Sequence, residues 1–334
     1  MNTARILRTC GLAAGLAAMW SAAGCQVVDQ QRAIHHAARG DEMLRGEQLD
    51  AALAEFNKAV QLNPRLALAY SRMGQIHRTQ GNYEKAAANY EQAVKLDPFS
   101  FEDTLNLGQV YHLLKRFADA AKAYLHACEL QPSNFEAHLN LGVCYHQQGQ
   151  LEQAIIAYRK AAKIEPDNAF VHSNLGAVFD AQGKYYEAIR AYKESLERDS
   201  KQAMVMVNLA TTYLKQQRFE PARKILELAI KLDEKQAVAH ERLGYCLYRL
   251  EQYDEAIASY DRALQADRKC AAAHAGLGVV RMTLYLVNND PSLRDAAIEN
   301  WHHSLELEPN QPQLRQLVAK YRPPTKTPRL LLSP

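Results

Sequence analysis

The sequence predicts an all-α protein built from repeated pairs of helices, and three periodic features support this prediction. Glycine recurs every 34 residues, alanine follows twelve residues after each glycine place, and a large side chain follows four residues later. The glycines are Gly40, Gly74, Gly108, Gly142, Gly176, Gly244 and Gly278, with Ala210 in the one remaining place. Because one 34-residue phase holds across seven successive repeats, we expect each repeat to be one supersecondary unit stacked on the next.

The residues at the other two periodic places explain how such repeats would pack. The alanines are Ala52, Ala86, Ala120, Ala154, Ala188, Ala222 and Ala256. The large residues are Phe56, Tyr90, Tyr124, Tyr158, Tyr192, Leu226 and Tyr260. Small residues suit places where two helices cross closely, because a larger side chain would force the backbones apart. We expect the large residues to fill the space between one repeat and the next.

Each repeat contains two segments with the apolar spacing of a helix. In the fourth repeat these segments are 135–147 and 151–164, and Gln-Gly-Gln at 148–150 forms the turn between them. Proline closes the first four repeats, at Pro64, Pro98, Pro132 and Pro166, because proline stops a helix. A single pair of helices cannot bury both of its faces, so the repeats must stack.

This pattern resembles the tetratricopeptide repeat, in which an aromatic residue, Leu-Gly, Tyr, Ala, Phe and a closing Pro recur over 34 residues. The resemblance covers eight repeats over residues 33–310. It implies a right-handed superhelical solenoid of helix-turn-helix repeats, whose first helices line a concave groove. The resemblance also implies a protein that binds other proteins and has no catalytic activity of its own.

The N-terminal residues 1–24 are typical of an export signal. Arg5 and Arg8 precede an uncharged apolar stretch that is short for a membrane-spanning helix. The following Ala22-Ala23-Gly24-Cys25 resembles the bacterial lipobox, which implies that Cys25 is acylated and anchors the protein to the membrane of the cell envelope. The family prefers Leu at the place of Ala22, so ordinary signal peptidase cleavage and secretion remain an alternative.

The remaining boundaries follow in chain order. Residues 25–32 form a short tether before the first repeat, so the repeats should sit close to the membrane. The eighth repeat has a seven-residue insertion, which we expect to lengthen its first helix, with Trp301 in the aromatic place. Residues 311–322 are expected to form a capping helix over the last apolar face, and the proline-rich tail 323–334 is expected to be disordered.

The candidate binding residues form a periodic set on the first helices. Asparagine stands at the sixth place of four successive repeats, at Asn106, Asn140, Asn174 and Asn208. The resemblance places them in the groove, where a side-chain amide can both donate to and accept from a peptide bond. His112, His146 and Asp180 are candidates for side-chain preference toward the bound segment. Asparagine is also common in the family at this place, so local capping or water binding is the alternative.

Other functions receive little support. With 40 Lys and Arg against 37 Asp and Glu, the net charge of +3 is too weak to predict nucleic-acid binding. No Cys or His pair has metal-ligand spacing, so we expect no metal or cofactor. Five histidines share the fourth place of a repeat, which favours packing between helices: His36, His138, His172, His240 and His274. A disulfide between Cys128 and Cys144 is left open.

No nucleotide-binding, metalloprotease or hydrolase motif stands in the context that would give it meaning, so we do not expect an enzyme. The sequence therefore predicts an exported, lipid-anchored scaffold that binds an extended segment of a partner protein. The alternatives are a secreted adaptor without lipid, or an accessory subunit of a separate envelope enzyme or of a secretion or pilus assembly.

Overall fold

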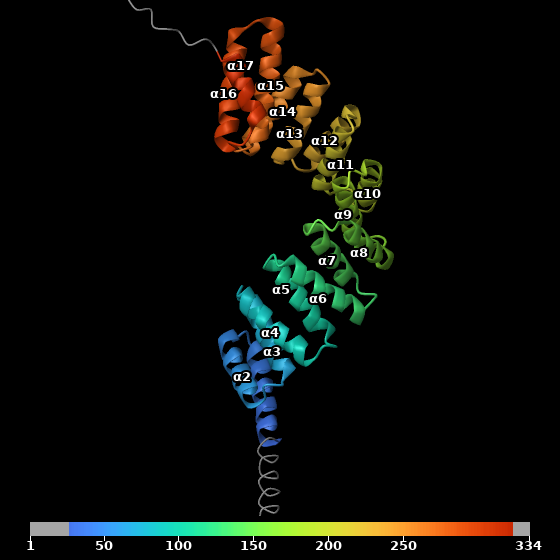
Figure 1. Ribbon diagram of the computed structural model, residues 1–334, viewed down its shortest axis with the longest axis vertical. Helices are drawn as coiled ribbons and strands as arrows, with labels where there is room; N and C mark the ends of the chain where they lie inside the picture. The colour runs from blue at the N-terminus through green and yellow to red at the C-terminus, as the bar shows by residue number, and fades with distance from the viewer. Residues whose placement is uncertain (1–26, 323–334) are drawn as a thin grey trace, which may run out of the picture. The chain divides into compact units, whose positions relative to one another are not determined.

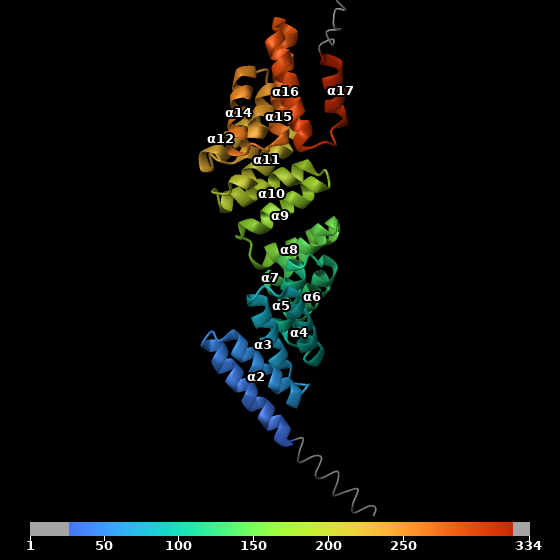
Figure 2. The ribbon, with the colours of Figure 1, turned by 90° about the vertical axis from the view of Figure 1, so that its left-hand side faces the viewer.

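The computed structural model describes residues 27–322, and all the regular secondary structure in this range is helical. Figure 1 and, turned by 90°, Figure 2 show these helices following one another as packed pairs along the chain. The chain divides into two compact units between Glu165 and Pro166. We call residues 27–165 the N-terminal unit and residues 166–322 the C-terminal unit, and each holds four of the predicted repeats.

The N-terminal unit begins with a helix that covers residues 27–45 of the described chain. It continues with α2 (Leu49–Leu62), α3 (Ala67–Thr79), α4 (Tyr83–Leu96), α5 (Phe101–Leu113), α6 (Phe117–Leu130), α7 (Phe135–Gln147) and α8 (Leu151–Ile164). Within this unit, each helix from α2 to α7 packs on the helix that follows it in the sequence. The predicted segments of the fourth repeat, 135–147 and 151–164, are confirmed as α7 and α8.

The C-terminal unit continues the same alternation. Its helices are α9 (Ala169–Ala181), α10 (Tyr185–Arg198), α11 (Ala203–Lys215), α12 (Phe219–Leu232), α13 (Ala237–Arg249), α14 (Tyr253–Ala266), α15 (Ala271–Asn288), α16 (Pro291–Leu307) and α17 (Pro312–Tyr321). The first helices of successive repeats also contact one another, since α11 touches α9 and α13, and α13 touches α15. These contacts place the first helices of this unit side by side.

The periodic large residues contact the periodic glycines, and this contact differs from the predicted place of the large residues between repeats. A Cβ atom added to Gly142 would lie 2.6 Å from the ring of Tyr158, which is only 1% exposed. The large residue therefore fills the space over the glycine of its own repeat. Tyr260 also lies against a glycine of the next repeat, Gly276, in addition to Gly244. The large residues therefore contact the glycine of their own repeat, and Tyr260 in addition fills space between two repeats, as expected.

The periodic alanines are fully buried. All seven have no exposed surface: Ala52, Ala86, Ala120, Ala154, Ala188, Ala222 and Ala256. Between the paired helices, a residue with positive φ makes the turn, and it is glycine in three repeats, as at Gly149 with a φ of 72°. The expected turn at 148–150 is therefore confirmed.

The eighth repeat absorbs its insertion in both of its helices. α15 has 18 residues where the first helix of the other C-terminal repeats has 13, and α16 has 17 where the second helix has 14. Trp301 is 1% exposed and lies against Gly278, so it takes the aromatic place as predicted. α17 then buries Leu314 and Val318 in the same cluster as Trp301, which confirms a helix at the predicted cap.

The N-terminal boundary differs from the expectation. Residues 27–32, predicted to belong to a tether over 25–32, are helical and run without a break into the first helix of repeat 1. A helix rises about 1.5 Å per residue against about 3.3 Å for an extended chain, so this stretch is shorter than an extended tether. The predicted signal 1–24, Cys25 and the tail 323–334 lie outside the described residues.

Candidate functional site

The four predicted asparagines lie on the first helices of four repeats, and all four side chains are half-buried. Asn106 is on α5 and Asn140 on α7 in the N-terminal unit, whereas Asn174 is on α9 and Asn208 on α11 in the C-terminal unit. The repeat therefore places a pair of asparagines, one repeat apart, on each unit. The two pairs have different surroundings.

In the N-terminal unit the asparagine amides belong to an intramolecular network. The Arg78 guanidinium donates to Asn106 Oδ1 at 2.7 Å and to Gln109 Oε1 at 2.6 Å. Gln109 Nε2 donates to Glu136 Oε1 at 2.7 Å, and Asn140 Nδ2 donates to the same oxygen at 3.4 Å. These bonds link α3, α5 and α7 across three repeats. Both asparagines of this unit therefore have partners within the protein.

In the C-terminal unit the asparagine side chains are free. Neither Asn174 nor Asn208 has a side-chain hydrogen-bond partner among residues 27–322. The nearby Asp180 is engaged, because Thr212 Oγ1 donates to it at 2.9 Å and the Lys215 ammonium forms an ion pair with its other oxygen. The two amides of this unit are thus the ones that can pair with a bound peptide backbone.

The candidate specificity residues differ in what they can offer. His146 is half-buried on α7, and burial lowers the pKa of its imidazole, which favours the neutral ring. The His112 ring lies 5.6 Å from the Phe117 ring, centre to centre, so part of its surface is used in packing. Asp180 is paired with Lys215 and presents little net charge. These residues can shape a polar surface, but they do not form a strongly charged one.

The histidines at the fourth place of the repeat have a structural role that the sequence only partly predicted. In four repeats Nε2 donates to the carbonyl of the residue six places earlier, in the loop between repeats: His138 to Pro132, His172 to Pro166, His240 to Glu234 and His274 to Arg268. The bonds are 2.9 to 3.3 Å long. His36 instead contacts Glu55, with 2.7 Å between Nδ1 and Oε2. The expected packing role is confirmed. The sequence signal for the loop contact was the constant spacing of six residues between each histidine and the loop residue it bonds.

The cysteines, the possible metal ligands and the possible membrane spans of the described residues complete the description of the site. Cys128, Cys144, Cys246 and Cys270 are free thiols, and burial raises the pKa of each one, to about 12 for Cys144. Within residues 27–322 no group of three or more His, Cys, Asp or Glu side chains could hold a metal ion. No helix of this range has the length and apolar character needed to cross a bilayer.

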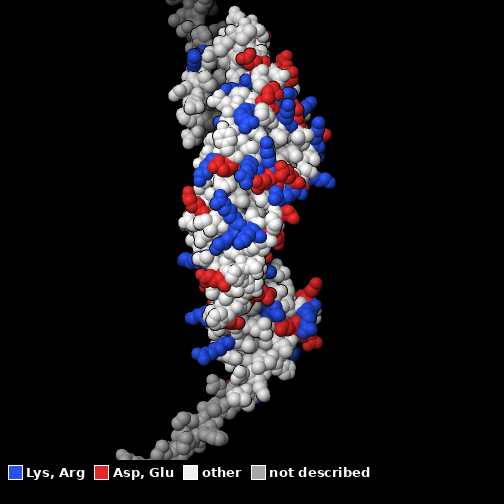
Figure 3. Space-filling model, turned by 90° about the vertical axis from the view of Figure 1, so that its right-hand side faces the viewer, with Lys and Arg blue, Asp and Glu red and all other residues white. Residues whose placement is uncertain are grey.

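Charged side chains of both signs share the visible surface. In Figure 3, Lys and Arg alternate with Asp and Glu over much of the face shown, which agrees with the small net charge of the sequence. Hydrogen bonding and shape therefore have more influence than long-range attraction on what this surface can recognise.

Comparison with known proteins places this architecture in a family. The sequence family described as the cilia and flagella-associated protein 70 C-terminal domain matches residues 26–277. No curated protein matches the sequence. Among solved structures, the chain is similar to the C-terminal part of a tetratricopeptide-repeat protein from Cytophaga hutchinsonii, with a TM-score of 0.60 at 16% identity over 73% of this chain and 98% of that one.

Two further structures show the same fold. PilF of Pseudomonas aeruginosa has a TM-score of 0.56 at 22% identity over 66% of this chain and 97% of that chain. A chain of the Cut9–Hcn1 hetero-tetramer of the APC/C has a TM-score of 0.56 at 20% identity, and the match covers 85% of this chain but only 55% of that chain. At these identities the similarity concerns the fold alone.

Proposed function

Because the chain belongs to the tetratricopeptide-repeat family described as the cilia and flagella-associated protein 70 C-terminal domain, we propose that it is a non-catalytic scaffold that binds other proteins. The bound element is an extended segment of a partner that lies across the first helices. The observation that carries this proposal is the pair of unpartnered amides, Asn174 and Asn208, on adjacent first helices of one unit.

The spacing of the repeat supports an extended ligand. Adjacent packed helices lie about 8–10 Å apart, and an extended peptide advances about 3.3 Å per residue, so successive asparagines meet every third residue. Asn174 and Asn208 together would hold a segment of about four residues. An amide that pairs with backbone recognises a peptide regardless of its side chains, and the polar surroundings would then set the preference.

The two asparagine pairs provide a matched test of this proposal. A partner is first captured by crosslinking in cells, and its bound segment is then titrated as a peptide. Asn174→Ala with Asn208→Ala removes two free amides, and at about 0.5–1.5 kcal/mol per hydrogen bond it should weaken binding about fivefold to 150-fold. Asn106→Ala with Asn140→Ala removes amides that already have partners and should change the affinity by less than about threefold.

Equal helix content in both double variants, measured by circular dichroism, is the control for folding. If the two double variants bind equally well, the peptide does not use the free amides and this surface is not the binding site.

An assay of any enzyme captured with the partner separates a scaffold from an accessory subunit, because only an accessory subunit would change the activity of that enzyme.

We also propose that Cys25 is acylated and holds the protein at the bacterial cell envelope, facing the periplasm. The proposal is supported by the signal-like residues 1–24 and the lipobox-like Ala22-Ala23-Gly24-Cys25. Wild-type protein should partition into the detergent phase, whereas Cys25→Ser should remain in the aqueous phase. Equal partitioning of both forms would favour the secreted adaptor without lipid.

A further inference from the structure

The histidines at the fourth place of the repeat share the bond from Nε2 to a loop carbonyl, but the surroundings of their other ring nitrogen, Nδ1, differ. Since a carbonyl oxygen only accepts, the bond from Nε2 to the loop carbonyl fixes Nε2 as the protonated nitrogen. The environment of Nδ1 then depends on the residues that the neighbouring helices bring to it. Three repeats, the fourth, the fifth and the seventh, hold their histidine buried, at 4% to 8% exposure.

In two of these repeats, Nδ1 has a protein group beside it. In the fourth repeat, His138 Nδ1 lies 3.3 Å from Cys128 Sγ. In the fifth repeat, His172 Nδ1 lies 3.2 Å from a carboxylate oxygen of Glu194, at ion-pair distance but without hydrogen-bond geometry. The same carboxylate accepts from Arg190 Nε at 2.9 Å. The fifth repeat therefore holds a carboxylate between an imidazole and a guanidinium.

The seventh repeat lacks both of these partners. Ile230 stands at the repeat place of Cys128, and Arg262 stands at the place of Glu194. His240 is 4% exposed, and its Nδ1 is buried without a hydrogen-bond partner among the described residues, as are the Nδ1 atoms of His172, which has Glu194 beside it, and of His274. A buried polar nitrogen without a partner is unusual in folded proteins, so this site calls for an explanation.

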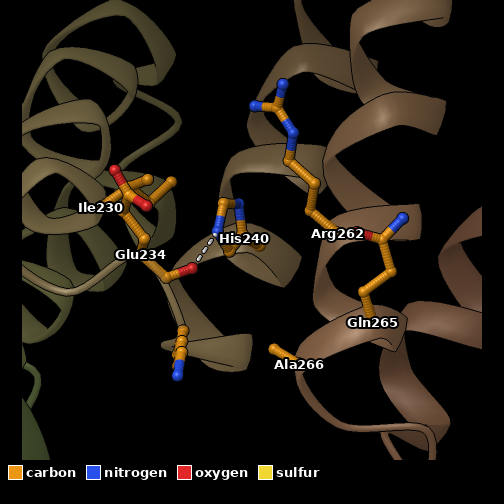
Figure 4. A pocket seen from close by; sticks show the side chains of 7 residues that line it. Ile230, Glu234, His240, Arg262, Gln265 and Ala266 are labelled. Carbon is orange, nitrogen blue, oxygen red and sulfur yellow. Dashed lines mark hydrogen bonds between the residues drawn. The ribbon is translucent and has the colours of Figure 1, made fainter.

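The unpartnered histidine borders a cavity. The cavity has a volume of about 620 Å³ and is lined by Ile230, Glu234, Lys235, His240, Arg262 and Gln265. Figure 4 shows His240 between the segment that carries Ile230 and Glu234 and the helix that carries Arg262 and Gln265. Lys235 and Arg262 are exposed cations, and Glu234 is the one anion among these lining residues.

We propose that this cavity binds the carboxylate of an acidic side chain in a segment of a partner protein, held between His240 and Arg262. The fifth repeat is the internal comparison, because Glu194 places a carboxylate 3.2 Å from His172 Nδ1 there, whereas the corresponding residue of the seventh repeat is Arg262, which lines the cavity. The exposed Arg262 side chain can turn toward the anion, and Lys235 adds a second positive charge. Charge-assisted bonds of this kind are among the strongest that a surface pocket offers.

Proton uptake accompanies this binding. A carboxylate only accepts, so Nδ1 must carry a proton to bond with it, and that proton comes from solvent. The charged groups that line the cavity with His240 are Glu234 and Lys235 from the loop before α13 and Arg262 from α14. Binding should therefore be tighter at pH 6 than at pH 8.

This site is separate from the asparagines of the proposed function. Its lining residues come from α12, the loop after it, α13 and α14, whereas Asn174 and Asn208 lie on α9 and α11. The two proposals can therefore fail independently. Asn174→Ala with Asn208→Ala should leave the cavity's affinity unchanged, and a change at the cavity should leave the asparagine surface intact.

The probe is a blocked peptide, acetyl-Gly-Glu-Glu-Glu-Gly-amide, titrated against the full chain by calorimetry at pH 6 and pH 8. Its glutamine analogue tests the need for a carboxylate, and free glutarate tests whether a small molecule suffices. We expect the glutamate peptide to bind at least about tenfold more tightly than the glutamine peptide. Calorimetry in buffers of different ionisation enthalpy should show proton uptake on binding.

Two charge reversals at the same repeat place give the matched control. Arg262→Glu builds the carboxylate of the fifth repeat into the seventh, where it occupies the site itself, and it should weaken the peptide at least about tenfold. Lys160→Glu makes the same charge change at the corresponding place of the fourth repeat, beside His138, and should leave peptide binding within about twofold.

The outcomes decide the proposal. Loss of binding in Arg262→Glu with retention in Lys160→Glu supports it. Equal binding by Arg262→Glu and wild type, or equal binding of the glutamate and glutamine peptides, overturns it. Displacement of the peptide by glutarate at equal concentration would assign the cavity to a free small carboxylate and overturn the assignment to a protein segment.

Discussion

The N-terminal and C-terminal units repeat one sequence pattern, yet the asparagines at the same place of the repeat have different hydrogen bonds in the two units. In the N-terminal unit, Arg78 from the preceding repeat bonds to Asn106, and Glu136 bonds to Asn140. In the C-terminal unit, Asn174 and Asn208 have no partner among the described residues. The comparison shows that a residue repeated at the same place of each repeat does not keep the same hydrogen bonds, because its possible partners differ from one repeat to the next.

Two buried glutamates make the same point in another way. Glu55 of the N-terminal unit is bonded by His36 at 2.7 Å and by Lys58 at 2.8 Å, and these bonds lower its pKa to about 2. Glu241 of the C-terminal unit forms an ion pair with Arg242, with 3.3 Å between Oε2 and Nε, and burial raises its pKa. One unit thus stabilises its buried carboxylate as an ion, and the other disfavours the ionised form.

The largest expected effect tests whether the units are independent in stability. Ala154 on α8 and Ala188 on α10 have no exposed surface, so leucine at either place overpacks the crossing of two helices and should cost about 1–3 kcal/mol. In a repeat protein each repeat contacts mainly its neighbours, so Ala154→Leu should lower amide-exchange protection mostly in the N-terminal unit and Ala188→Leu mostly in the C-terminal unit.

Hydrogen exchange read by mass spectrometry, together with urea unfolding, measures this. Uniform loss of protection along the whole chain in both variants would show that the two units unfold as one body. Wild-type behaviour of Ala154→Leu would contradict the tight crossing assigned to the periodic alanines.

A second effect is the opposite pH dependence of the two glutamates. A lowered pKa contributes stability above the ordinary value of about 4.5, and this contribution is lost as pH falls toward 2. Glu55→Gln should therefore destabilise the protein at pH 7, and its difference from wild type should shrink as pH falls from about 4.5 toward 2.

Glu241→Gln should behave in the reverse way. A raised pKa means that ionisation opposes folding, and this penalty grows as pH rises above the ordinary value of about 4.5. The variant should therefore be more stable than wild type at pH 7 and equal to it near pH 4. Urea titrations of both variants between pH 3 and pH 7 would show whether the two curves diverge with opposite sign.

The smallest expected effect concerns the aromatic residue that lies over each glycine. The Tyr90 hydroxyl of the N-terminal unit is buried without a hydrogen-bond partner, and burial raises its pKa to about 12. Tyr90→Phe removes that unpaired group and should stabilise the protein by up to about 1 kcal/mol. Tyr192→Phe, at the corresponding place of the C-terminal unit, is the reference. Thermal unfolding that ranks Tyr90→Phe below this reference would mean that the hydroxyl has a partner in solution.

Much of the architecture could be predicted because each repeat is a local structure. The helices of the fourth repeat, the turn at 148–150, the aromatic place of Trp301 and the helix after residue 311 depend on patterns within a few dozen residues. The start of the first helix could not be predicted in this way. Residues 27–32 precede the periodic pattern, and their helix is a continuation of the one that buries Ala33 and Ala37.

The sequence by itself determined the all-α class, the 34-residue repeat and the places of the asparagines and histidines, because apolar spacing and small residues act within one pair of helices. Only the tertiary structure decided which of these polar groups are free. The partner of Asn106 lies 28 residues away at Arg78, whereas the carboxylate that stands 22 residues after His172, at Glu194, is replaced by Arg262 at the same distance from His240. Stacking brings such residues together or leaves them apart, and each pairing depends on the particular side chains of two or three neighbouring helices.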